Sequence, residues 1–119
     1  MHDRLVDRLI ATQERNLMQE NFQFPTPPLA GTQDIIPLTC YADLVSEGIQ
    51  MKHCVSTYSD RVMSGRYYVY RVKSPERATI GLNIPSDGSI SIDQVRGRSN
   101  KSVDPETLGL VNVWLYQRE

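Results

Sequence analysis

His53 and Cys54 stand side by side in the sequence, and this pair is the first feature with the residue types for catalysis. A nearby imidazolium lowers the pKa of a thiol and leaves a thiolate ready to attack, which suits a nucleophile and its base. Adjacent helical positions, however, point about 100° apart, so the two side chains pair only on an irregular first turn. Free Cys is also among the most buried residue types. We therefore predict His53 as a ligand-facing donor at a helix N-terminus and keep Cys54 open as nucleophile or buried core thiol.

The segment QVRGRSN carries a second group of polar side chains, with Gln94, Arg96, Arg98 and Asn100 as directional donors. Gly97 permits either a close approach or a positive φ at the end of the strand. Such a loop suits the recognition of a phosphate or a base. It has a single glycine and is not one of the Gly-rich phosphate-binding motifs.

The basic residues gather around these groups, since residues 52–101 hold nine Lys and Arg against four Asp and Glu. Tyrosines in the same region could stack on a base or serve the core. The catalytic residues stay unknown, with His53 and Cys54 as the candidates. The predicted ligand-binding residues are His53, Tyr58, Arg66, Tyr68, Arg77, Gln94, Arg96, Gly97 and Asn100. No Cys and His cluster has the spacing of metal ligands, so we expect no metal and no cofactor. We also expect no disulfide between Cys40 and Cys54, because thiols stay reduced in the cytoplasm.

The elements that position these residues begin with an amphipathic helix over residues 3–20, followed by a proline-rich stretch. Four prolines favour an extended arm on the surface over residues 22–38. Thr39 is the predicted cap of a short helix from Tyr41 to Glu47 that ends at Gly48. A second helix is predicted from Met51 to Ser64, with Gly65 as its stop.

Three strands follow, because polar and apolar residues alternate over residues 66–72, 77–84 and 89–96, with a hairpin signal at Asp87-Gly88. Asp104, Pro105 and Glu106 have the types that open a helix. Its expected apolar stripe is Leu108, Leu110, Val111, Trp114 and Leu115. The pattern predicts a single small α+β domain, a three-stranded antiparallel meander packed with three to four helices.

Length and composition agree with one globular domain, since the chain has 119 residues, of which 39% are hydrophobic and 23% charged. No apolar run approaches the roughly 20 residues needed to cross a bilayer, and the N-terminus mixes acids with bases. We expect a cytoplasmic protein without a membrane partner. The first helix and the arm have little of their own to bury against, which favours a homo-oligomer.

The segments EGIQMKHCVSTYSDRVMSGRYYVYRV, SPERATIGL and QVRGRSN resemble the PcfJ-like family, which is found in conjugative plasmids, phages and other mobile elements. The resemblance extends from about Ile36 to Leu115. It divides the chain into a helix over 1–21, an arm over 22–38 and a PcfJ-like domain over 39–119. The residues that align with the family pattern are His53, Cys54, Tyr58, Gly65, Arg77, Gln94, Gly97 and Asn100. The family brings no established reaction, so the resemblance implies the place of the site and a genetic setting.

Three functions stay open. The favoured one is a mobile-element or phage accessory protein that binds a nucleotide-like or other phosphate-bearing ligand without catalysis, as in the sequestration of a host defence signal. The first alternative is a Cys- or His-dependent enzyme acting on a nucleotide or phosphodiester. The second is a nucleic-acid-binding module, against which the pI of about 6.1 argues.

Overall fold

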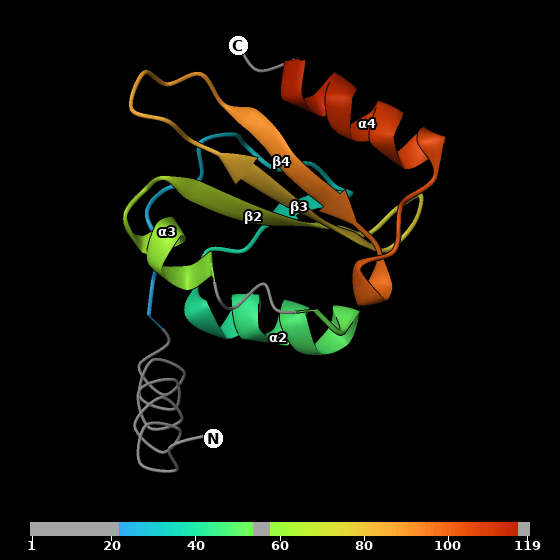
Figure 1. The fold of residues 1–119 in the computed structure, drawn as a ribbon, viewed down its shortest axis with the longest axis horizontal. Coiled ribbons are helices and arrows are strands. Elements are labelled where there is room, and N and C mark those ends of the chain that lie inside the picture. Colours follow the sequence, from blue (N-terminus) through green and yellow to red (C-terminus); the bar gives the residue numbers. More distant parts are fainter. Residues whose placement is uncertain (1–21, 54–57, 117–119) are drawn as a thin grey trace, which may run out of the picture.

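The computed structural model describes residues 22–53 and 58–116, which form a four-stranded antiparallel sheet between two helical layers (Figure 1). Helices α2 (Tyr41–Met51) and α3 (Ser59–Met63) lie on one face of the sheet, and α4 (Pro105–Tyr116) lies on the other. This confirms the α+β class. The predicted helix over residues 3–20 falls outside the described residues. None of the helices inside them has the length and apolar content required to cross a membrane.

The sheet has the order β1-β2-β3-β4, and its strands are β1 (Ile35–Pro37), β2 (Tyr67–Val72), β3 (Ala78–Asn83) and β4 (Ser91–Arg96). Strands β2 to β4 are the predicted meander. The prediction of three strands is wrong by one, because β1 pairs with β2 from within the proline-rich arm. Pro37 is compatible with this place since an edge strand leaves one side of its backbone unpaired.

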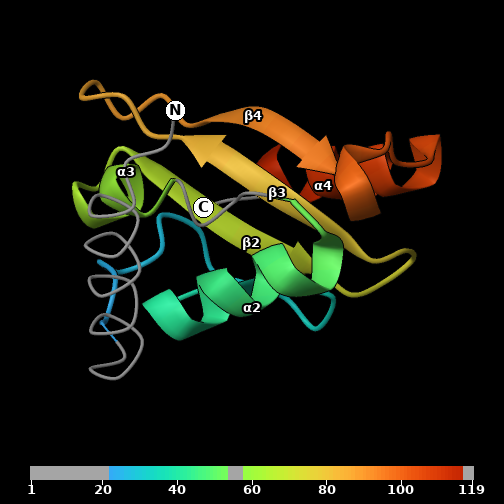
Figure 2. The same ribbon diagram turned by 60° about the horizontal axis from the view of Figure 1, so that its bottom comes forward.

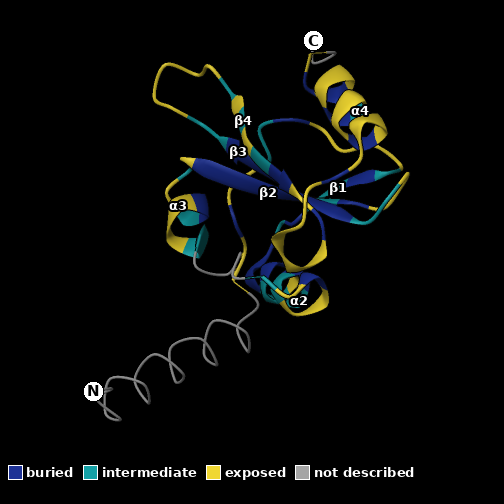
Figure 3. Cartoon of the chain, turned by 45° about the vertical axis from the view of Figure 1, so that its right-hand side comes forward, coloured by how far each residue is buried: buried dark blue, intermediate teal, exposed yellow. Residues whose placement is uncertain are grey.

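The proline-rich arm was predicted to lie on the surface, and eight of its 17 residues are exposed, but the buried side chains of Phe24, Leu29, Ile35 and Leu38 anchor it in the core. Prolines prevent regular hydrogen bonding, but side chains of the core replace it. The Tyr70 hydroxyl donates to the Leu29 carbonyl at 2.7 Å and accepts from the Leu29 amide at 3.1 Å. The arm is therefore held by β2, which is buried along most of its length (Figure 3).

Helix α2 begins at Tyr41 as predicted, but its cap and its end differ from the prediction. Cys40, not Thr39, is its N-cap, and the helix continues through Gly48 to Met51. Its stop is Lys52, in the left-handed conformation with φ 53° and ψ 50°. The apolar stripe explains the extra turn, because Tyr41, Leu44 and Met51 all lie on the buried face.

The predicted helix from Met51 to Ser64 is therefore wrong as one element. Met51 ends α2, His53 lies beyond it, and α3 begins only at Ser59. Residues 54–57, which include Cys54, fall outside the described residues. Gly65 follows α3 with φ +78°, so its predicted role as a stop is confirmed.

Helix α4 begins at Pro105 as predicted, and Val111, Trp114 and Leu115 are buried. Trp114 packs edge-on against Tyr70, with the ring centroids 4.8 Å apart. Leu108, predicted in the apolar stripe, is 41% exposed. The helix thus rests on the sheet through its C-terminal half.

Tyr70→Phe tests whether the arm belongs to the core. The substitution leaves the amide and carbonyl of Leu29 without their partner in a buried place, so we expect the free energy of unfolding to fall by about 1–3 kcal/mol. Urea unfolding measures this. Tyr116→Phe is the control, since Tyr116 is 76% exposed and should lose less than about 0.5 kcal/mol. An equal effect of the two variants would contradict the arrangement of the arm.

Candidate functional site

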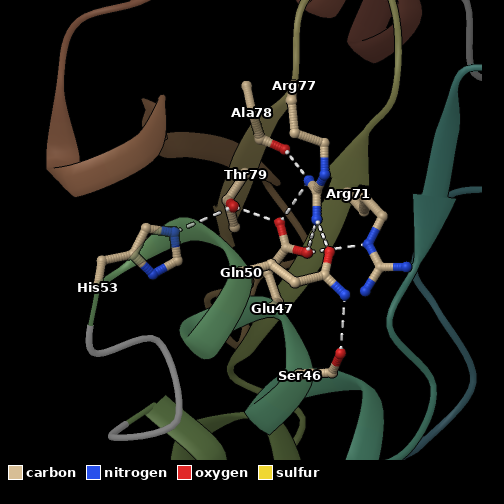
Figure 4. A network of polar contacts seen from close by, with 8 residues as sticks. All are labelled: Ser46, Glu47, Gln50, His53, Arg71, Arg77, Ala78 and Thr79. Carbon is tan, nitrogen blue, oxygen red and sulfur yellow. Dashed lines mark hydrogen bonds and ion pairs between the residues drawn. The ribbon is translucent and has the colours of Figure 1, made fainter.

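A fully buried carboxylate, Glu47, lies between α2 and the sheet at the centre of a polar network (Figure 4). It accepts a hydrogen bond from Arg71 Nε at 2.9 Å on β2 and from Arg77 Nη1 at 2.9 Å, just before β3. Arg77 Nη2 and the Thr79 hydroxyl also donate to it. One helix and two strands are thus joined through a single side chain.

Glu47 and Arg71 are not among the site residues predicted from the sequence. A signal was present, because Glu47 falls on the same face of α2 as Leu44 and Met51, where an apolar residue is expected. A charged residue in such a stripe is almost never buried without a partner. The place of Glu47 in this stripe would therefore have predicted an arginine partner on the facing strands.

The electrostatics of Glu47 depend on two opposing effects. Burial by itself raises its pKa, but hydrogen bonds from Arg77, Thr79 and Arg71 outweigh burial, and the pKa lies below its ordinary value. Glu47 is therefore ionised at neutral pH.

Arg77, a predicted ligand-binding residue, uses most of its N–H groups in hydrogen bonds within the protein. Nη1 donates to Glu47 and to the Ala78 carbonyl at 3.1 Å, and Nη2 donates to Glu47 and to Gln50 Oε1 at 3.0 Å. Since a guanidinium has five N–H donors, these bonds leave the one on Nε. Arg77 is thus a fixed positive charge with little capacity left to bind a ligand directly.

His53 joins the same network, with its Nε2 3.1 Å from the Thr79 hydroxyl oxygen. Thr79 has one hydroxyl proton and gives it to ionised Glu47, so it must accept the bond from His53 Nε2–H. This fixes the tautomer of the neutral ring. Nδ1 is then an acceptor, buried and without a hydrogen-bond partner among the described residues.

The place of His53 corrects the prediction of a donor at a helix N-terminus, because His53 follows the C-terminal end of α2. Burial lowers its pKa, and the charge of Glu47 offsets this only in part. His53 is therefore a neutral ring at pH 7, and its only N–H is already used.

A pocket of about 470 Å³ opens beside Arg77, where the end of α2 meets the loop after β4. We call it the basic pocket. It is lined by Lys52, Glu76, Arg77, Gly97, Arg98, Ser99, Lys101 and Ser102.

Four cations of the basic pocket face a single carboxylate, Glu76. Glu76 Oε1 accepts hydrogen bonds at 2.6 Å from the Asp104 amide and the Thr107 hydroxyl, at the start of α4, and these bonds lower its pKa. No side-chain hydrogen bond or ion pair joins Lys52, Arg98 or Lys101 to another described residue. These three cations are exposed and available to an anion.

The backbone around the basic pocket is unusual. Lys52, Ser99 and Asn100 have φ of 53°, 58° and 61°, and in the described ranges no other non-glycine residue has a positive φ. Left-handed residues other than Gly cost energy and gather at functional sites. Gly97 has φ −83°, so the predicted positive φ is wrong, and a Cβ added there would meet the Lys101 carbonyl oxygen at 3.4 Å, an ordinary contact. Its amide donates to that carbonyl at 2.7 Å.

The other predicted residues divide into two groups. Arg96 and Gln94 lie on β4 opposite Thr79 and Gly81, on the face that carries the Glu47 network. Arg66 lines a different depression together with Arg61.

Two predicted tyrosines also lie away from the basic pocket. Tyr58 stacks on Tyr67 with the ring centroids 4.9 Å apart. Tyr68 is buried, and its hydroxyl donates to the Pro25 carbonyl at 2.9 Å, which agrees with the core-packing alternative. The described residues bring no three His, Cys, Asp or Glu side chains together as a metal site.

Glu47→Gln tests the network. Removing the charge leaves two arginines facing a neutral amide, and we expect the free energy of unfolding to fall by about 2–3 kcal/mol. The arginine side chains are 26% and 32% exposed and can turn to water, which moderates the loss. Glu106→Gln, at an exposed position of α4, is the control and should stay within about 0.5 kcal/mol of the parent in urea unfolding. A loss no larger than that of the control would refute the central role of Glu47.

The protonation of His53 gives a pH-dependent prediction. Because its folded pKa lies below 6.5, the unfolded chain takes up a proton that the folded protein resists. The free energy of unfolding should fall as the pH decreases below 6.5, and a second loss from Glu47 should begin only below 4.5. An NMR titration of the ring protons should show a midpoint below 6.5 for the resonance that disappears in His53→Gln. A midpoint above 6.5 would mean that the ring is not buried as described.

Comparison with known proteins identifies the family. A family model described as PcfJ-like protein matches residues 1–109, which is most of the chain. Neither the curated proteins nor the solved structures contain a significant match. The match covers the end of α2, the Glu47 network and the basic pocket, and it agrees with the resemblance of the motifs. The chain therefore belongs to the PcfJ-like family.

Proposed function

We propose that this PcfJ-like protein binds a small phosphate-bearing ligand in the basic pocket and returns it unchanged. The observation that carries the proposal is a pocket of about 470 Å³ lined by three cations, Lys52, Arg98 and Lys101, whose side chains have no partner among the described residues. Arg binds two phosphate oxygens at once with its planar fork, and Lys adds a mobile point charge. In a mobile element, such a protein would act by sequestering a phosphate-bearing signal of its host.

Binding is favoured over catalysis because of how the network uses its groups. The single N–H of neutral His53 is bonded to Thr79, and Arg77 has four of its donors occupied. Arg77 lines the basic pocket, and His53 is bonded to Thr79 in the network behind it. A general acid or a charge-stabilising arginine would need those donors free for the reacting group.

The proposal is tested by titrating the full chain with a panel of nucleoside mono-, di- and triphosphates in a calorimeter. Arg98→Gln should weaken binding by at least about tenfold, since it removes a charge-assisted pair. Arg66→Gln is the matched control: it removes the same charge from an exposed position in the other depression and should leave the affinity unchanged.

Three results would contradict the proposal. Equal losses in Arg98→Gln and Arg66→Gln would move the site away from the basic pocket. The recovered ligand is also weighed by mass spectrometry after the protein is denatured, and an altered mass would establish the enzyme alternative. Tighter retention of an oligonucleotide than of any panel member would favour the nucleic-acid alternative.

A further inference from the structure

The residue types that line the basic pocket also indicate which class of anion it can bind. Apart from Gly97, every residue that lines the basic pocket is charged or carries a hydroxyl group. The lining has no aromatic, apolar or amide side chain. Proteins that read a nucleobase stack it on aromatic rings or on Arg guanidinium planes, and they bond its edge with directional groups such as amides. The basic pocket offers neither an aromatic ring nor an amide.

The aromatic rings on which a base could stack already contact other side chains of the protein. Tyr58 and Tyr67 stack on each other, and the Arg61 guanidinium lies over the Tyr67 ring at 4.4 Å from its centroid. Arg61 is in turn fixed by Asn83 Oδ1 at 3.0 Å. This aromatic group is also absent from the lining of the basic pocket.

The basic pocket and the Glu47 network together carry a net charge of +3, which exceeds the charge of a single phosphate. Glu47 offsets only one of the two arginines bonded to it, Arg71 and Arg77. Ionised Glu76 offsets only one of the three cations Lys52, Arg98 and Lys101. A phosphate monoester brings a charge of about −2 at neutral pH, and a second phosphate brings at least one more.

The three cations also come from two segments that meet only in the fold. Lys52 ends α2, whereas Arg98 and Lys101 belong to the loop around η2 (Arg98–Asn100), which packs beside that end of α2 (Figure 2). A ligand that satisfies all three must reach from one segment to the other. Ser99 and Ser102 add neutral hydroxyl donors between them.

We infer that the basic pocket recognises two or more adjacent phosphate groups and does not read a base. The inference rests on the proposed function and specifies its ligand class: a diphosphate, either inorganic or as the phosphate end of a nucleotide of any base. Lys52 contacts one phosphate while Arg98 and Lys101 contact the other.

The test titrates the full chain, at fixed ionic strength, with pyrophosphate, ADP, CDP, orthophosphate and adenosine. Pyrophosphate, ADP and CDP should bind with affinities within about fivefold of one another, and orthophosphate at least about tenfold more weakly. Adenosine should not bind. Lys52→Gln should weaken pyrophosphate binding by about tenfold and should affect orthophosphate less, because a single phosphate need not reach both segments. Arg66→Gln is the control and should change neither affinity.

The outcomes distinguish a failure of the two-phosphate inference from a failure of the proposed function, the binding of a phosphate-bearing ligand. No binding of any phosphate compound would end both. Binding of ADP without pyrophosphate, or a large preference between ADP and CDP, would show base recognition, which overturns the inference and leaves the function standing. Orthophosphate as tight as pyrophosphate, or an equal loss for both in Lys52→Gln, would overturn the two-phosphate class in the same way. Circular dichroism and urea unfolding of each variant distinguish a lost contact from a lost fold.

Discussion

One ionised carboxylate beneath the sheet, Glu47, sets the arrangement of the side of the domain that carries the site. A charge with no solvent exposure is tolerated only where paired groups replace its hydration. Arg71 and Arg77 supply those groups from two strands, and Thr79 supplies a hydroxyl. Helix α2 can therefore dock on the sheet at one position only. The same requirement places the residues after α2 beside the end of β4, where the basic pocket opens.

The two faces of the sheet consequently differ in the side chains that they bury. On the face toward α4, Tyr68, Tyr70 and Ile80 form an apolar core whose few polar atoms are bonded to the arm. On the face toward α2, β2 and β3 present Arg71 and Thr79 to a buried charge. Both faces bury apolar side chains, among them Tyr41, Leu44 and Tyr67 on the second. The second face combines this packing with a polar network and with left-handed backbone at its edge.

How much the sequence predicts depends on how local the cause is. Strands β2 to β4 and helix α4 follow from short-range patterns: alternation over six residues, and an Asp, Pro and Glu opening. Strand β1 has three residues and forms only because β2 is present to pair with it. Helix α2 passes Gly48 because the burial of Met51 outweighs the local preference of glycine to end a helix. The Glu47 network joins residues 24 to 32 positions apart, which no local pattern encodes.

The residues predicted as a site and the residues that line the basic pocket come from the same region of the chain, but only some of them are the same. His53 and Arg77 stand out in the sequence by their residue types, yet the bonds they make are internal. Lys52 and Lys101 have the types of ordinary surface residues, and only the fold brings them to one pocket with Arg98. A buried network must be satisfied before it can be functional, so its most reactive side chains are the least available. For this domain, we expect a ligand to contact Lys52, Arg98 and Lys101 in the basic pocket. The buried carboxylate of Glu47 acts indirectly, because it fixes where α2 and the strands, and hence the pocket, lie.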